Sequence, residues 1–181
     1  MKVGARVVVV TGGGSGIGAA LARRFAAEGA SAVVVADRDA AAAQAVAAQC
    51  AGVGHARGLD VTDGAATEAL VAEVEATLGP IALFCANAGV GVPEGAYPAD
   101  VVWQRLWQVH VMAHVHAARA LVPRMTARPE GGWLLVTASA AGLPLLYTRQ
   151  FIPNPSSLQS SSTNNPMTTS SKLYKIKILH W

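Results

Sequence analysis

The sequence predicts an α/β protein: a doubly wound parallel sheet with helices on both faces. Runs of β-branched residues alternate with segments of helical periodicity along most of the 181 residues, and each connection is long enough for a crossover helix. The first such run also leads directly into a glycine-rich turn. With 52% hydrophobic and 14% charged residues, the chain has enough apolar material for the core of one domain.

Residues 5–61 of the body predict three strands and two helices. Residues 5–11 are a β-branched run that ends in glycines, and residues 17–28 follow with apolar side chains at helical spacing. Residues 31–36 are again rich in valine, and the alanine-rich residues 39–49 favour a helix. Residues 55–61 predict a third strand from a weaker apolar pattern. Two successive strand–helix–strand units follow from this order.

The remainder of the body repeats the alternation. Residues 63–78 predict a helix that Asp63 can cap and whose apolar residues share one face. Residues 81–86 form an apolar run typical of a buried strand. Residues 99–125 predict a long helix, and residues 132–138 predict a fifth strand.

Composition changes abruptly near residue 146. No alanine or glycine follows residue 142, and residues 153–172 are a polar, low-complexity stretch that should be disordered. We therefore interpret residues 1–146 as one body and residues 147–181 as an appendage of different origin. An alternative transcript, a frameshift or a misplaced gene end would each produce such a change.

Charge and cysteine usage narrow the class of protein. Residues 1–148 carry a net charge of −1 and residues 149–181 carry +4, which is too dispersed to predict a nucleic-acid partner. No apolar run approaches the ~18 residues of a membrane span, so we expect no membrane association. Cys50 and Cys85 belong to no metal or disulfide pattern, which favours a reducing, cytoplasmic setting.

The glycine-rich turn at residues 11–18, TGGGSGIG, carries the clearest chemistry. Glycine is needed where a pyrophosphate must approach the backbone, and the helix that follows supplies free N–H groups for the anion. Asp37 ends the second predicted strand, 19 residues after Gly18, where a carboxylate would accept hydrogen bonds from an adenosine ribose. Alternatively, the glycines could form only a flexible turn, and Asp37 could be an ordinary residue at the end of a strand. The strand before the turn, the helix after it and the acid at this distance together favour a dinucleotide-binding site.

At this point the chain resembles the short-chain dehydrogenases/reductases. The family's Thr-Gly-x-x-x-Gly-x-Gly pattern is met between Thr11 and Gly18. Asp60 matches its adenine-contacting acid, and residues 86–89 match its Asn-Asn-Ala-Gly segment with alanine in place of the first asparagine. The resemblance covers residues 5–142 and assigns cofactor binding to Thr11, Gly12, Ser15, Gly16, Ile17, Gly18, Asp37, Asp60, Val61, Asn87, Ala88 and Gly89.

The resemblance implies a Rossmann-like fold and an NAD(P)-dependent oxidoreductase that transfers hydride between a nicotinamide and an alcohol or carbonyl substrate. Asp37 favours NAD over NADP because its carboxylate would repel a 2′-phosphate, although Arg38 could accommodate that phosphate. In the family the long helix helps to form oligomer interfaces. Trp103 and Trp107 are therefore expected to pack against the body or against a second subunit of a homo-oligomer.

The catalytic part of the pattern is incomplete. Ser139 matches the family's catalytic serine, but His110 stands at the position of its catalytic asparagine. The family's Tyr-x-x-x-Lys motif has no counterpart, since neither Tyr147 nor Tyr174 is followed four residues later by lysine. A serine hydroxyl alone cannot move the proton at neutral pH. We therefore expect little or no turnover, and the alternative function is a non-catalytic nucleotide-binding fragment or an interaction partner of an intact homologue.

Two weaker patterns complete the analysis. His110, His114 and His116 cluster at a spacing that can bind a metal, but no carboxylate or cysteine stands near them, so we expect no metal site. By resemblance the sheet is truncated after its fifth strand, which leaves an apolar edge at residues 133–137 that invites aggregation or a partner. Residues 173–179 partly alternate apolar residues with lysine and could add to that edge as a substitute strand.

Overall fold

A computed structural model of the chain describes residues 3–91, 99–138 and 177–179. The strands are β1 (Val7–Thr11), β2 (Ala32–Asp37), β3 (Gly54–Gly58), β4 (Ile81–Ala86), β5 (Trp133–Thr137) and β6 (Lys177–Leu179). The helices are α1 (Gly16–Ala27), α2 (Ala40–Ala47), α3 (Gly64–Thr77), α4 (Asp100–Trp107), the π-helical turn η1 (Gln108–Met112) and α5 (Ala113–Thr126).

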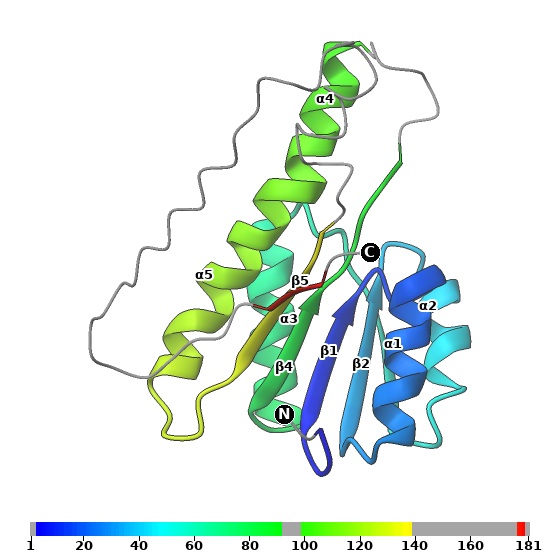
Figure 1. The fold of residues 1–181 in the computed structure, drawn as a ribbon, viewed down its shortest axis with the longest axis vertical. Helices are drawn as coiled ribbons and strands as arrows, with labels where there is room; N and C mark the ends of the chain where they lie inside the picture. The colour runs from blue at the N-terminus through cyan, green and yellow to red at the C-terminus, as the bar shows by residue number, and fades with distance from the viewer. Residues whose placement is uncertain (1–2, 92–98, 139–176, 180–181) are drawn as a thin grey trace, which may run out of the picture.

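The six described strands form one parallel sheet in the order β3-β2-β1-β4-β5-β6. Helices α1 and α2 cover one face, and α3 and α5 cover the other (Figure 1). The strand order reverses between β1 and β4, so the crevice above the carboxyl ends of these two strands is the place where such sheets bind ligands. The doubly wound α/β fold predicted from the sequence is confirmed.

The valine run of β1 shows how the sequence builds the two layers. Val7 and Val9 pack into the core beneath α3 and α5, whereas Val8 and Val10 pack into the core on the side of α1 and α2. All four side chains are buried because successive residues of a strand point to opposite faces, and here both faces are covered.

The third strand is shorter than the predicted residues 55–61 and ends at Gly58. Leu59 still donates its amide to the carbonyl of Asp37 at 2.9 Å, but the chain then turns. Asp60 directs the turn, because its Oδ1 accepts hydrogen bonds from the amide of Thr62 at 2.9 Å and from its hydroxyl at 2.8 Å. A side chain that bonds its own backbone two residues onward competes with the strand ladder.

Two helices begin at a capping aspartate, and of these caps the sequence analysis predicted only Asp63. Asp39 caps α2 by accepting the amide of Ala42 at 3.0 Å, and Asp63 caps α3 by accepting that of Ala66 at 3.0 Å. Helix α2 ends at Ala47, two residues before the predicted end at residue 49.

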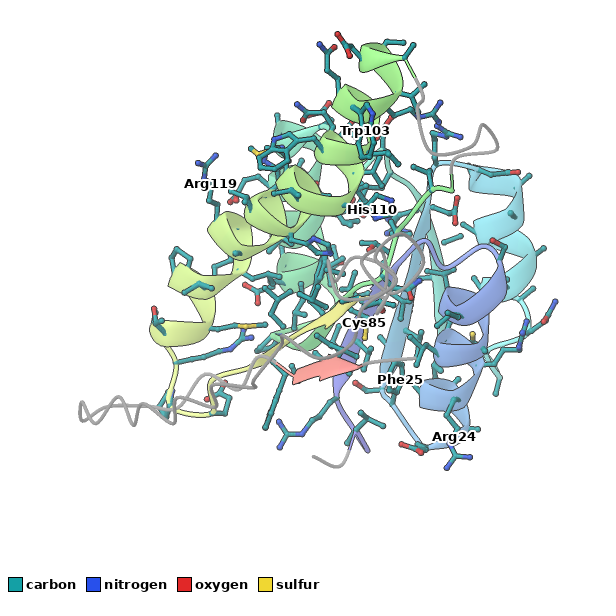
Figure 2. The ribbon with its side chains drawn as sticks, turned by 45° about the horizontal axis from the view of Figure 1, so that its top comes forward. Arg24, Phe25, Cys85, Trp103, His110 and Arg119 are labelled. Atoms are coloured by element: carbon teal, nitrogen blue, oxygen red, sulfur yellow. The ribbon has the colours of Figure 1, made fainter. Side chains whose placement is uncertain are left out.

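The predicted helix at residues 99–125 is continuous but not uniformly α-helical. One π turn, η1, joins α4 to α5, and the sequence pattern did not predict it. The rod formed by the three segments extends beyond the carboxyl ends of the strands (Figure 1). Trp103, labelled in Figure 2, is 55% exposed and Trp107 is 57% exposed, so the expected packing against the body is not found. Packing against a second subunit stays a prediction.

The edge of β5 is paired with a strand from the end of the chain. Val136 lies opposite Ile178 in a parallel register, and Thr137 lies opposite Leu179. The predicted substitute strand at residues 173–179 is confirmed for Lys177–Leu179.

The expected disorder at residues 153–172 concerns positions outside the described residues. None of the described helices is long and apolar enough to cross a membrane.

Candidate functional site

The glycine-rich turn between β1 and α1 packs closely against its neighbours, and Gly12 and Gly18 approach other backbone atoms most tightly. Gly12 has a φ of +63°, and a Cβ there would lie 2.7 Å from the Cα of Ala88. A Cβ on Gly18 would collide with the carbonyl group of Gly12. At Gly16, by contrast, φ is +49° and a Cβ would meet no atom of the described chain within 4 Å. Gly12 and Gly18 therefore shape the turn, and Gly16 faces open space.

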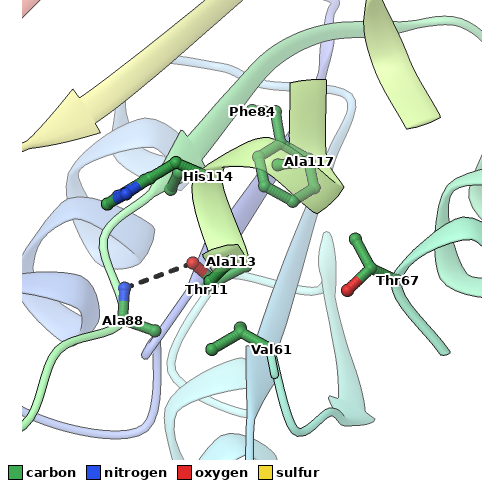
Figure 3. Close-up of a pocket in the computed structure, with 9 residues that line it drawn as sticks. Thr11, Val61, Thr67, Phe84, Ala88, Ala113, His114 and Ala117 are labelled. Atoms are coloured by element: carbon green, nitrogen blue, oxygen red, sulfur yellow. Dashed lines mark hydrogen bonds between the residues drawn. The ribbon is translucent and has the colours of Figure 1, made fainter. Parts of the chain in front are cut away.

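Thr11 connects the end of β1 to the segment after β4. Its buried hydroxyl donates to the carbonyl of Cys85 at 3.2 Å and accepts the amides of Asn87 at 3.0 Å and Ala88 at 3.2 Å. Figure 3 shows the Ala88 amide facing this hydroxyl. A cavity of only about 10 Å³ adjoins Thr11 and is also lined by His114, which leaves room for at most one water molecule.

Asn87 extends the connection to β5. Its Nδ2 donates to the carbonyl of Thr11 at 3.2 Å, and its Oδ1 accepts the hydroxyl of Thr137 at 3.0 Å. The carboxyl ends of β1, β4 and β5 are thus joined through one amide side chain. This chain of hydrogen bonds fixes the floor of the crevice at the strand-order reversal.

Asp37 is held at the end of β2 by two backbone amides. Its Oδ2 accepts the amide of Gly14 at 2.9 Å, and its Oδ1 accepts that of Asp39 at 3.0 Å. The carboxylate is therefore fixed against the glycine-rich turn, with the exposed Arg38 beside it.

Asp60 lies in the turn after β3 rather than within a strand. The hydrogen bonds from the amide and the hydroxyl of Thr62 lower the pKa of its carboxyl below the ordinary value, and the charges of Arg38 and Arg105 add to that effect. The group is ionised at neutral pH and contributes negative charge to the rim of the crevice.

These segments surround a cavity of about 500 Å³ at the carboxyl edge of the sheet, a size typical of small-molecule sites. Every residue predicted to bind the cofactor except Thr11 lines it. Thr11 lies beneath and holds the segment after β4. The sequence reasoning missed three lining residues, Val90, Val109 and Thr137. Thr137 ends the fifth predicted strand, but only the pairing of β5 beside β4 brings its hydroxyl to Asn87.

The remaining candidates divide between described and undescribed residues. His110 lies beside the cavity, with its Nε2 2.9 Å from the carbonyl oxygen of Val90. Ser139 lies outside the described residues, so the structure does not place it. His110, His114 and His116 do not converge, and no group of three or more metal-ligating side chains occurs among the described residues.

A parallel sheet with a glycine-rich turn at its strand-order reversal defines the class of α/β nucleotide-binding proteins. A profile of the family described as short chain dehydrogenase matches residues 6–149. The chain belongs to this family. It is 41% identical over 145 residues to a 1-deoxy-11-beta-hydroxypentalenate dehydrogenase of Streptomyces exfoliatus, a match that covers 77% of this chain and 52% of that protein.

Solved structures agree in fold. A 3-ketoacyl-(acyl-carrier-protein) reductase of Brucella melitensis, complexed with NADH, has a TM-score of 0.73 at 32% identity, over 78% of this chain and 61% of that one. A metagenomic short-chain oxidoreductase in complex with NADP has a TM-score of 0.71 at 32% identity, over 78% and 66%. The chain spans about half the length of the curated relatives it matches.

Proposed function

We propose that this chain binds a nicotinamide dinucleotide in the 500 Å³ cavity at the carboxyl ends of β1 and β4. The observation that carries the proposal is convergence: residues from four separate segments, after β1, β2, β3 and β4, line one cavity at the strand-order reversal. Relatives of the same fold are described in complex with NADH and with NADP, which supports the cofactor class.

The turn before α1 fits a pyrophosphate. Gly16 leaves open space in front of the helix, and in the described structure the side chain of Ser15 makes no capping hydrogen bond to the first turn. The amides at the start of α1 are therefore free to donate to an anion, and the helix dipole favours negative charge there.

Asp37 and Arg38 bear on the choice between NAD and NADP. We propose a preference for NAD, because the Asp37 carboxylate is fixed by two backbone amides and cannot easily turn away from a 2′-phosphate. Replacing Asp37 with asparagine is expected to narrow the difference in affinity between NADH and NADPH. An unchanged ratio of the two dissociation constants would contradict this assignment.

A pair of substitutions at Gly16 tests the binding site. Asparagine and aspartate have nearly the same shape and both tolerate a positive φ, so Gly16→Asn and Gly16→Asp differ chiefly in charge. Calorimetric titration with NADH should show binding to the parent chain, weaker binding to Gly16→Asn and a further loss of about tenfold or more for Gly16→Asp. A folded parent chain that does not bind NADH would refute the proposal.

We further propose that the 181-residue chain binds the cofactor without turning over a substrate. A bound nicotinamide dinucleotide would supply the hydride donor or acceptor. The chain itself supplies Ser139 from the family pattern but no Tyr-x-x-x-Lys pair to move the proton. NADH oxidation followed at 340 nm with a panel of ketones and aldehydes should stay at the level of the buffer. Turnover by purified chain would favour an active dehydrogenase acting on an alcohol or carbonyl compound.

A further inference from the structure

Strand β6 comes from a part of the chain that lies beyond the family's match. The short chain dehydrogenase profile ends at residue 149, whereas β6 comprises Lys177–Leu179. It pairs in parallel with β5 and is the last strand of the described sheet; in Figure 1 it is the short red arrow beside β5. Membership of the family therefore assigns no role to β6, and its place in the sheet is a property of this chain.

The register of the strands shows what β6 contributes to β5. Pairing between β4 and β5 ends at Ala86, which lies opposite Val136. Thr137, the last residue of β5, lies one position further along, and its partner in the described ladders is Leu179 of β6. Among the described strands, the backbone at the carboxyl end of β5 is therefore held from the β6 side alone.

Thr137 is also part of the candidate site. It lines the cavity of about 500 Å³, and its hydroxyl donates to the Oδ1 of Asn87 at 3.0 Å. All five residues of β5 are only half-buried, whereas all six of β4 are buried, so β5 is less well covered. A strand end with little cover opens more readily than a strand in the centre of a sheet. Without β6, the bond to Asn87 would be the remaining cross-strand hydrogen bond of Thr137 in the described structure.

We propose that β6 is a positioning element of the cofactor site: it holds the carboxyl end of β5, and thereby Thr137, in the arrangement that lines the cavity. This inference rests on the proposed dinucleotide binding. If β6 is displaced, the end of β5 must be ordered when the cofactor binds, and that ordering reduces affinity. The coupling is reciprocal by thermodynamic linkage, so a bound dinucleotide stabilises the pairing of β6 with β5 by the same factor.

Proline substitutions within β6 test the effect of the strand on affinity. The N–H groups of successive strand residues point to opposite edges, so either Ile178→Pro or Leu179→Pro removes a donor that faces β5. At least one of the two should weaken NADH binding by about fivefold, the equivalent of one ordinary hydrogen bond. Trp181→Pro, outside β6, is the control and should bind like the parent chain. Calorimetric titration is done at a chain concentration where sedimentation velocity shows a single species, because an unpaired edge favours self-association.

Thr137→Val separates positioning from general stability. Valine keeps the shape of the side chain and removes the hydroxyl that donates to Asn87. If β6 acts through Thr137, combining Thr137→Val with the weakening proline should cost less binding free energy than the sum of the two single losses. A role of β6 in general stability alone would leave the two losses additive.

Hydrogen exchange on the unaltered chain tests the reciprocal effect and needs no variant that must fold. At saturating NADH, the amides of residues 177–179 should exchange about fivefold more slowly than without it, as mass spectrometry can show. Such protection, together with weaker and non-additive binding in a proline variant, supports the inference. Parent-like binding by both proline variants, additive losses, or unchanged exchange at residues 177–179 overturns it and leaves the proposed function intact. A folded parent chain that binds no NADH refutes the proposed function, and this inference with it.

Discussion

Thr11 offers the sharpest test of how the site is built, because one hydroxyl group connects β1 to the segment after β4. Replacing Thr11 with valine keeps the shape of the side chain and removes only its hydrogen-bonding capacity. The carbonyl of Cys85 then loses a donor, and the amides of Asn87 and Ala88 lose their acceptor.

The expected loss follows from the environment of these groups. A buried donor left without a partner costs about 1–3 kcal/mol, but Asn87 and Ala88 are half-buried and water can reach them in part. We take about 1 kcal/mol for each amide and little for the Cys85 carbonyl, which gives about 2 kcal/mol in the free energy of unfolding. Thr11→Ser removes one methyl group and should cost about 0.8 kcal/mol.

Urea unfolding followed by circular dichroism measures both variants against the parent chain. The midpoint should fall while the slope with urea stays constant, since the surface exposed on unfolding is unchanged. NADH affinity should fall in Thr11→Val because the backbone from Asn87 to Gly89 is released. If Thr11→Val is as stable as Thr11→Ser within about 0.5 kcal/mol, the hydroxyl does not support the site and the reasoning is wrong.

Three further outcomes are expected. Gly18→Ala should lose the native circular dichroism spectrum, because its Cβ has no room beside Gly12. Gly16→Ala should still fold, with a free energy of unfolding lower by about 1–2 kcal/mol, since its φ is positive but the space around it is open. Equal effects of the two substitutions would contradict the roles assigned to these glycines. Burial raises the pKa of the Cys85 thiol to about 12, so the reactive thiolate is scarce at pH 8. Mass spectrometry should therefore show that iodoacetamide at pH 8 labels Cys85 only in denaturant. Rapid labelling of the native chain would mean that the core around Cys85 is open. Ile178→Pro should disrupt β6, leave the edge of β5 unpaired and promote self-association, which sedimentation velocity measures. The control Trp181→Pro, at a position outside the bounds of β6, should not. Identical behaviour of the two variants would count against the β6 pairing.

Most of the fold could be predicted from the sequence because its elements depend on local patterns. The valines of β1 and the capping residue Asp63 each indicate their element from the sequence of a few neighbouring positions. The end of β3 could not be placed, because it depends on whether Asp60 bonds Thr62 or leaves the ladder intact. Both arrangements suit the same sequence, and tertiary context decides between them.

The site was predictable where its residues belong to a motif and unpredictable where they meet only in space. Gly12–Gly18 and Asp37 were found by spacing. Thr137 reaches the site because β5 lies beside β4 and its hydroxyl meets Asn87, a contact between residues 50 positions apart. The π turn around His110 was missed because apolar spacing along a helix does not distinguish one inserted residue from an even α-helix.

The division between cofactor binding and catalysis follows from the order of the elements. Among the described residues, every one that lines the cavity lies at or before Thr137. The segments that carry these residues lie at the end of a strand of the sheet or in the rod beside it. The family's proton-transfer residues belong to the chain beyond that point, where this sequence changes composition and has no Tyr-x-x-x-Lys pair. The described residues that line the cavity are therefore separate in the sequence from the segment in which the family's proton-transfer pair is expected. This separation along the sequence is the reason for our proposal that the chain binds the cofactor without turnover.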